Sequence, residues 1–185
     1  MEKSNHSNVL IVGGGCAGIA VASRINSLKS DLTISIVEPS EKSLYQAAWT
    51  LVGAGAYNVN DTIKPMSSVM PSYVKWIKEY AEEFLPDSNS LKTNGGTYTY
   101  DYLVVCPGLK LNYDGVAGLK ENLGKNNVCT NYSAEMATYT WDCLKQLDGG
   151  TLLFTEPPMP IKCAGAPQKI AYLAADHLKK KGKLS

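Results

Sequence analysis

The sequence predicts an α/β fold built on a parallel sheet, and three observations near its beginning predict it. An apolar run at 8–12 leads directly into a glycine-rich turn at 13–18. Small and apolar residues then recur at helical spacing over 16–28, and a second run of strand-forming residues follows at 32–38. Strand, tight turn, helix and strand in this order form a βαβ unit, which is typical of a Rossmann-like domain.

The turn matches G-x-G-x-x-G at Gly13, Gly15 and Gly18, between a strand and a helix as that motif requires. Gly13 allows the tight turn, Gly15 lets a pyrophosphate come close to the backbone, and Gly18 lets the helix lie against the strand. Free N–H groups near Cys16 and Ala17 would face an anion at the positive end of the helix. The motif in this setting predicts a dinucleotide-binding site.

Glu38 lies 20 residues after Gly18, at the end of the second strand, where a carboxylate can accept hydrogen bonds from ribose hydroxyls and would repel a 2′-phosphate.

FAD and NAD share this fingerprint. A simple NAD dehydrogenase would continue with alternating strands and helices, but 40–72 is loop-rich, and we expect small antiparallel strands over 73–100 before a buried strand at 102–106. This layout is typical of flavoproteins with two dinucleotide-binding domains and favours FAD.

The later segments predict helices at 133–147 and 165–181, with a strand at 151–155 between them. The first helix is expected to begin after Ser133 and to present four residues on one face: Met136, Tyr139, Thr140 and Cys143. We therefore expect an FAD-binding domain over 1–148, with its antiparallel insertion at about 73–100, and an incomplete start of a second Rossmann-like domain over 149–185. Prolines follow the strand at 151–155 in place of a second glycine motif, which disfavours nicotinamide binding there.

Composition narrows the classes of partner. The net charge is +1, from 18 basic and 17 acidic residues, so no nucleic-acid partner is expected. The five cysteines form no C-x-x-C pair, and no signal or transit peptide is visible, which indicates an intracellular protein. No stretch is apolar enough to span a membrane, so membrane contact would be peripheral. Two distant histidines and scattered cysteines predict no metal site.

Several stretches carry a family resemblance. They are VEPSEKSLYQAAWTLVGAGA at 37–56, IKPMSSVMPSYVKWIKEYAEEFLPD at 63–87, YDYLVVCPGLKLNYD at 100–114, NYSAEMATYTW at 131–141 and IKCAGAPQKIAYLAADH at 161–177. In these stretches the chain resembles the sulfide:quinone oxidoreductases, most closely the mitochondrial-type branch, and matches only their N-terminal part. The resemblance implies a flavoprotein oxidoreductase that oxidises sulfide with FAD and passes the electrons to a quinone.

The resemblance also implies the site residues. FAD would lie with its pyrophosphate against Gly13, Gly15, Cys16, Ala17 and Gly18, its ribose at Glu38, its adenine at the backbone of Ala81, and Gln46 near the cofactor. Cys163 matches the redox cysteine that holds substrate sulfur as a persulfide or bridging sulfur. It precedes a helix and follows Lys162, so we expect a reactive thiol. We interpret Cys106 and Cys143 as core residues, and the role of Cys129 stays open.

The family's second redox cysteine and its quinone-binding, membrane-attaching elements lie beyond the matched part, so we expect this chain to be incomplete for turnover. A sulfur acceptor is implied as a further substrate. A full-length form would be peripheral on a respiratory membrane, either the bacterial inner or the mitochondrial inner membrane. Two alternatives stay open: a catalytically silent, truncated FAD- or NAD(P)-binding module, and an NAD(P)H-dependent flavoprotein reductase.

Overall fold

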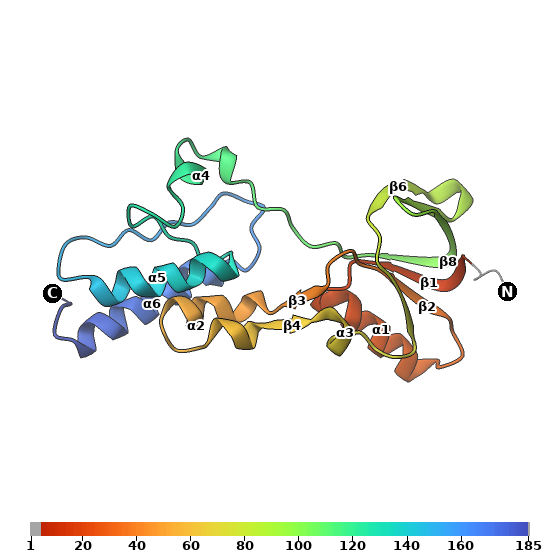
Figure 1. Cartoon of the computed structure of the whole chain (residues 1–185), viewed down its shortest axis with the longest axis horizontal. Coiled ribbons are helices and arrows are strands. Elements are labelled where there is room, and N and C mark those ends of the chain that lie inside the picture. Colours follow the sequence, from red (N-terminus) through yellow and green to blue (C-terminus); the bar gives the residue numbers. More distant parts are fainter. Residues whose placement is uncertain (1–4, 185) are drawn as a thin grey trace. The chain divides into compact units, whose positions relative to one another are not determined.

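The computed structural model describes residues 5–184, which pack as two compact units (Figure 1). The first, called here the sheet unit, comprises residues 5–43 and 64–108. The second, called the helical unit, comprises residues 44–63 and 109–184. The chain leaves and re-enters the sheet unit through two short paired strands, β3 (Lys42–Leu44) and β4 (Ile63–Pro65).

The sheet unit is built on a six-stranded mixed sheet with the order β5-β2-β1-β8-β7-β6. The strands are β1 (His6–Val12), β2 (Ile34–Val37), β5 (Val74–Ile77), β6 (Ala81–Leu85), β7 (Ser90–Thr93) and β8 (Thr97–Val105). Strands β5, β2, β1 and β8 run parallel, whereas β7 pairs antiparallel with both β8 and β6. The helices α1 (Cys16–Leu28) and α3 (Met66–Val69) complete the unit.

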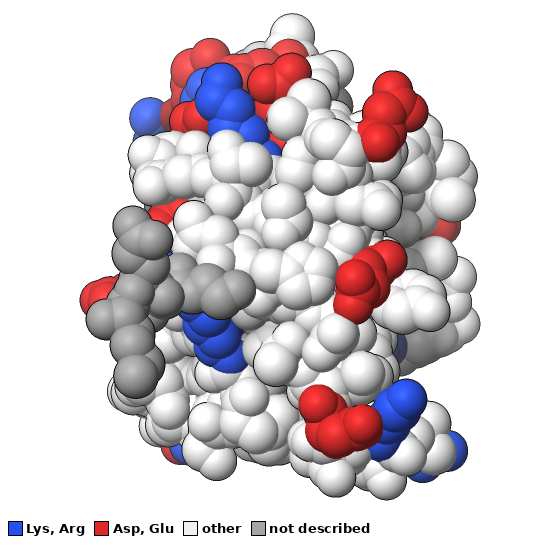
Figure 2. Space-filling view, turned by 90° about the vertical axis from the view of Figure 1, so that its right-hand side faces the viewer, with Lys and Arg blue, Asp and Glu red and all other residues white. Residues whose placement is uncertain are grey.

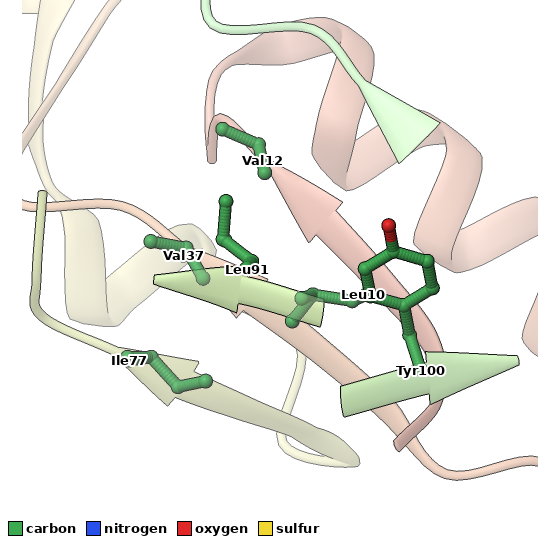
Figure 3. Packing of buried hydrophobic residues seen from close by; sticks show 6 residues of the cluster. All are labelled: Leu10, Val12, Val37, Ile77, Leu91 and Tyr100. Carbon is green, nitrogen blue, oxygen red and sulfur yellow. The ribbon is translucent and has the colours of Figure 1, made fainter. Parts of the chain in front are cut away.

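Strand β1 is the centre of the core because both of its faces are buried, as expected for a continuous apolar run in a parallel sheet. On one face lies a cluster of buried side chains shown in Figure 3: Leu10, Val12, Val37, Ile77, Leu91 and Tyr100. On the other face lies a second cluster, to which α1 contributes a residue: Val9, Ile11, Ala22, Ile34 and Ile36. These two layers hold the carboxyl ends of β1 and β2 at one edge of the sheet.

The helical unit is formed by three helices and connecting turns. They are α2 (Trp49–Gly53), α5 (Ala134–Gln146) and α6 (Gly165–Lys180), and the short α4 (Leu119–Asn122) lies in the segment of the same unit before α5. Its buried side chains are Trp49, Val52 and Ala137 in one cluster and Leu144, Ile170 and Ala174 in another. The Trp49 indole N–H donates to Thr62 Oγ1 over 3.0 Å, so the segment between α2 and β4 is held against this core.

The structure confirms the α/β fold, the first βαβ unit and the helices expected at 16–28, 133–147 and 165–181. Four expectations about the elements are wrong. The strand expected to be buried at 102–106 is the end of the longer β8 and is not buried, since Tyr102 is 70% exposed and Val105 is 53% exposed. Strand β5, within the expected antiparallel segment, pairs in parallel with β2, so antiparallel pairing starts only at Ala81. Helix α5 buries Ala137, Thr140 and Leu144, so Thr140 is the one member of the expected face that is buried.

The fourth wrong expectation is the strand at 151–155. This segment has no strand structure, and Leu153 is 78% exposed. A strand needs a neighbour to satisfy its N–H and C=O groups, and no other segment of residues 5–184 pairs with this one. The division at 148–149 and the start of a second domain therefore stay predictions.

Two surface features bear on partners. Outside the part that residues of uncertain placement cover, Figure 2 shows acidic and basic side chains scattered over a larger uncharged area. This face has no continuous basic surface of the kind that binds nucleic acid. Within residues 5–184, every helix is too short or too polar to cross a membrane.

Candidate functional site

The glycine turn has the shape that its motif predicts. Gly13 has φ +103°, and a Cβ added there would overlap the carbonyl oxygen of Cys106. A Cβ on Gly18 would overlap the carbonyl oxygen of Gly13, which shows how closely α1 lies against the end of β1. The Gly13 N–H donates to the Val37 carbonyl over 2.9 Å, which fixes the turn beside β2. Only glycine fits at positions 13 and 18.

Gly15 differs from the other two because nothing crowds it. No described atom lies within 4 Å of a Cβ built at Gly15, so this side of the turn is open. Gly15 is the N-cap of α1, no side chain caps the helix, and its first turn holds no acidic residue. The exposed residues Cys16 and Ala17 therefore offer backbone N–H groups to an anion. The residues present fit the pyrophosphate of a dinucleotide.

Glu38 lies directly beside this turn. Its Oε2 accepts the Gly14 N–H over 2.8 Å, and its Oε1 accepts the Ser40 N–H over 2.8 Å. These two bonds fix the carboxylate, and each oxygen keeps a lone pair for a further donor such as a ribose hydroxyl. The Trp76 indole N–H donates to the Glu38 carbonyl over 2.8 Å, so the backbone is held as well.

Ala81 belongs to the sheet unit as well. It is the first residue of β6 and packs against the buried cluster that contains Val12 and Val37, the residues that precede the glycine turn and Glu38. The structure therefore brings the three glycines, Glu38 and Ala81 together within one unit. Gln46 and Cys163 belong to the helical unit.

Cys163 stands just before α6 in a strained conformation. Its φ is +57°, a left-handed value that is uncommon for a residue with a side chain. Its carbonyl oxygen accepts the Tyr132 hydroxyl over 3.2 Å and the Ala166 N–H over 2.8 Å. These two donors hold the strained residue in place. The side chain itself is half-buried.

Lys162 and Gln46, which the sequence analysis treated separately, meet beside Cys163. The neighbouring Lys162 donates from Nζ to Gln46 Oε1, so Gln46 lies next to the segment that carries Cys163. Burial raises the pKa of Tyr132, and the nearby Cys163 and Glu156 raise it further, which keeps the phenol protonated as a donor. Sequence reasoning missed Tyr132, although it lies within the stretch 131–141 that carries the family resemblance.

The other half-buried cysteines have different surroundings. Cys106 packs against the cluster that α1 covers, and burial raises the pKa of its thiol. The core interpretation of Cys143 is wrong, because its side chain is only half-buried and its S–H donates to Asn127 Oδ1 over 3.7 Å. Cys129 lies beside Cys143.

The parallel sheet, the glycine turn at an uncapped helix and the acidic residue after β2 define a dinucleotide-binding protein of the Rossmann class. The sequence pattern of the pyridine nucleotide-disulphide oxidoreductases matches residues 7–137, and the chain belongs to that family. The family is FAD-dependent, and the cradle in the sheet unit fits that cofactor.

Individual relatives narrow the comparison. The chain is 42% identical over 180 residues to the mitochondrial sulfide:quinone oxidoreductase of Mus musculus and 45% identical over 184 residues to that of Dictyostelium discoideum. These matches cover 97% and 98% of this chain, and 40% and 41% of the relatives. The crystal structure of the sulfide:quinone oxidoreductase from Aquifex aeolicus has 28% identity and a TM-score of 0.72, covering 96% of this chain and 40% of that one. The chain thus spans about two fifths of these relatives.

Proposed function

We propose that this chain binds FAD and takes part in the oxidation of sulfide, with the electrons passed to a quinone. The observation that carries the proposal is identity of 42% and 45% to sulfide:quinone oxidoreductases through 97% and 98% of the chain, both units included. A silent binding module and an NAD(P)H-dependent reductase are the alternatives that the experiments below distinguish.

In this proposal the sheet unit holds the cofactor, which supplies a two-electron acceptor when bound. The backbone N–H groups of Cys16 and Ala17, together with Gly13, Gly15 and Gly18, bind the pyrophosphate. Glu38 accepts from the ribose hydroxyls, the backbone of Ala81 contacts the adenine, and Gln46 lies near the cofactor. The open space at Gly15 and the absence of a side-chain cap on α1 support this assignment.

Cys163 is proposed to carry the substrate sulfur. Hydrosulfide attacks a disulfide in which Cys163 takes part, a new S–S bond forms at Cys163, and the partner sulfur leaves as a thiolate. Cys163 is then a persulfide, and no external oxidant is consumed in this exchange. Tyr132 holds the backbone of Cys163 through its carbonyl oxygen.

The partner sulfur comes from a second cysteine that, by the family resemblance, lies outside residues 1–185. Turnover with quinone, a sulfur acceptor and peripheral binding to a respiratory membrane are proposed for a form that includes the sequence of the relatives beyond the matched two fifths. We expect no quinone reduction above background from the 185-residue chain. Robust sulfide-dependent quinone reduction by this chain would contradict that expectation.

The test of the cofactor site is a matched pair of glycine variants. We expect the purified chain to retain FAD, and Gly15→Val to lose it while its circular dichroism is unchanged, because the new side chain fills the space meant for the pyrophosphate. Gly96→Val is the control, because a Cβ there also meets no described atom within 4 Å. Equal flavin content in the two variants, read from the flavin absorbance, would refute the assignment.

The test of the sulfur site uses a small disulfide in place of the missing partner. Cys163 is first converted to a mixed disulfide with glutathione, and sulfide is then added. We expect mass spectrometry to find a persulfide on Cys163 and none in Cys163→Ala. A persulfide that forms equally on Cys106 would show that the chemistry is unselective, and the function would then reduce to a silent flavin-binding module.

A further inference from the structure

Cys129 and Cys143 form a pair of thiols that the proposed function does not use. Cys129 lies on the connection before α5, and Cys143 lies on α5 itself. Both sulfurs contact one residue: the Cys129 S–H donates to the Asn127 carbonyl over 3.6 Å, and the Cys143 S–H donates to Asn127 Oδ1 over 3.7 Å. The two thiols therefore meet at the same residue, and both side chains are half-buried.

The backbone around Asn127 holds this pair together. Gly124, Asn126 and Asn127 all have left-handed φ values, of 76°, 53° and 61°. The Asn127 N–H donates to the Tyr139 hydroxyl on α5 over 3.1 Å, which ties the turn to the same helix that carries Cys143. The Val128 N–H donates to the Lys125 carbonyl over 2.9 Å, and this bond closes the turn. The turn and α5 therefore hold both thiols on Asn127 without a covalent link between them.

The chemistry of the pair differs from that of Cys163. Burial, together with the neighbouring Cys143, raises the pKa of Cys129 to about 12, so this thiol is almost fully protonated near neutral pH. It attacks external electrophiles slowly, because the thiolate is the nucleophile. A second thiol held in contact with it gains a large effective concentration, and this favours reaction within the pair.

We propose that Cys129 and Cys143 are a disulfide-forming site, oxidised by a low-molecular-weight disulfide. The Cys143 thiolate attacks the small disulfide and releases one small thiolate, and Cys129 then displaces the second as it gives up its proton. In total, two protein thiols and one small disulfide become one protein disulfide and two small thiols. The link joins the segment before Tyr132 to α5, and it is independent of the function proposed for Cys163.

The test compares native and unfolded protein. The 185-residue chain, loaded with FAD, is treated with oxidised glutathione without oxygen, remaining thiols are blocked with N-ethylmaleimide, and cross-linked peptides are identified by mass spectrometry. We expect one cross-link, Cys129 to Cys143, which dithiothreitol reverses. In urea the five cysteines should pair in a mixture. The same mixture in native protein, or separate glutathione adducts on Cys129 and Cys143, would overturn the proposal.

Variants separate this site from the other thiols. Cys163→Ala and Cys106→Ala should both keep the Cys129–Cys143 cross-link, whereas Cys143→Ala should lose it and leave Cys129 as a free thiol or a glutathione adduct. A cross-link that disappears in Cys163→Ala would mean that the pair is oxidised only through Cys163, and this would also overturn the proposal. The wild-type measurement decides the matter even if Cys143→Ala fails to fold.

Discussion

Glu38 illustrates how single residues prepare the candidate site before any ligand binds. Its carboxylate already accepts two backbone N–H groups, from Gly14 and Ser40, so a ribose would meet an acceptor that is fixed in place. Gly14 itself has no room for a side chain, because a Cβ there would lie 2.7 Å from the Glu38 Cβ. A preorganised acceptor loses little conformational entropy when a ligand binds.

Replacement of Glu38 by Ala is expected to weaken FAD binding by about 1–3 kcal/mol, because it removes the ribose acceptor and leaves the phosphate cradle intact. A flavin-fluorescence titration measures the change in Kd. The matched control is Glu41→Ala, which removes an exposed carboxylate that pairs with Lys78 over 2.8 Å. An affinity that falls equally in both variants would argue against a contact between Glu38 and the cofactor.

Cys163 is expected to be alkylated first among the five cysteines when the FAD-loaded chain is treated briefly with iodoacetamide near neutral pH. This expectation rests on the role proposed for Cys163, because a cysteine that carries substrate sulfur must be accessible and reactive. Burial raises the pKa of Cys106, and Cys129 is mostly protonated, so both should react later. Peptide mass spectrometry locates the label, and faster labelling of Cys106 or Cys143 would contradict the role given to Cys163.

Among the elements, α6 carries a titratable group in an unusual place. The His177 ring meets the Trp141 ring of α5 edge to face, with centroids 4.8 Å apart and planes at 73°. Its Nε2 is buried without a hydrogen-bond partner among the described residues. Burial lowers the pKa of His177, Lys181 and Lys180 lower it further, and Asp176 opposes them. The contact between the two helices therefore favours a neutral histidine.

The sign of the resulting pH dependence follows from proton linkage. The unfolded chain takes up the His177 proton near pH 6.5, whereas the folded chain takes it up only at lower pH. The stability due to the neutral ring is therefore complete above pH 6.5 and is lost as the pH falls toward the folded pKa. We expect the Tm, followed by tryptophan fluorescence, to fall between about pH 7.5 and pH 5.5 in the wild type.

The variant His177→Phe keeps an aromatic ring against Trp141 and removes the proton, so its Tm should change less over the same pH range. The exposed His6 provides the control, because His6→Gln should retain the wild-type pH dependence. If His177→Phe has the same pH dependence as the wild type, another group is responsible for it.

The segment 151–155, which was expected to be a strand and is not, is a second case in which an element depends on its neighbours. The sequence TLLFT has strand-forming residues, and Leu152, Leu153 and Phe154 are all exposed. Local preference alone cannot hold a strand, because its backbone groups must pair with another segment. Helix α5 differs less from its prediction. Its span was predictable from periodicity, but packing against its neighbours buries a face that is shifted toward Ala137 and Leu144.

At the scale of the whole molecule, two cores form from interleaved segments of one chain. The sheet unit buries Leu10 completely, and the helical unit buries Leu144 to 4% exposure. These two residues belong to separate clusters with no member in common. Each unit therefore has its own source of hydrophobic stabilisation.

Leu10→Ala is expected to destabilise the sheet unit by about 2–5 kcal/mol, and Leu144→Ala is expected to do the same in the helical unit, because each leaves a cavity in one core. Hydrogen exchange measured on peptides from each unit reports the two effects separately. We expect exchange to increase mainly in the unit that carries the substitution. Equal increases in both units would indicate one cooperative core.

The sequence by itself determined the βαβ unit, the three glycines and the acidic residue of the cradle, because these depend on steric requirements and periodicities within about thirty residues. Family resemblance added Gln46, Ala81 and Cys163 as proposed site residues, and for Gln46 and Ala81 no local pattern indicated a role. Only the tertiary structure decided that Tyr132 bonds to Cys163, that Lys162 meets Gln46, that Cys129 and Cys143 both contact Asn127, and that residues 151–155 form no strand. Each of these depends on contacts between segments distant in sequence, and such contacts are set by packing rather than by local preference.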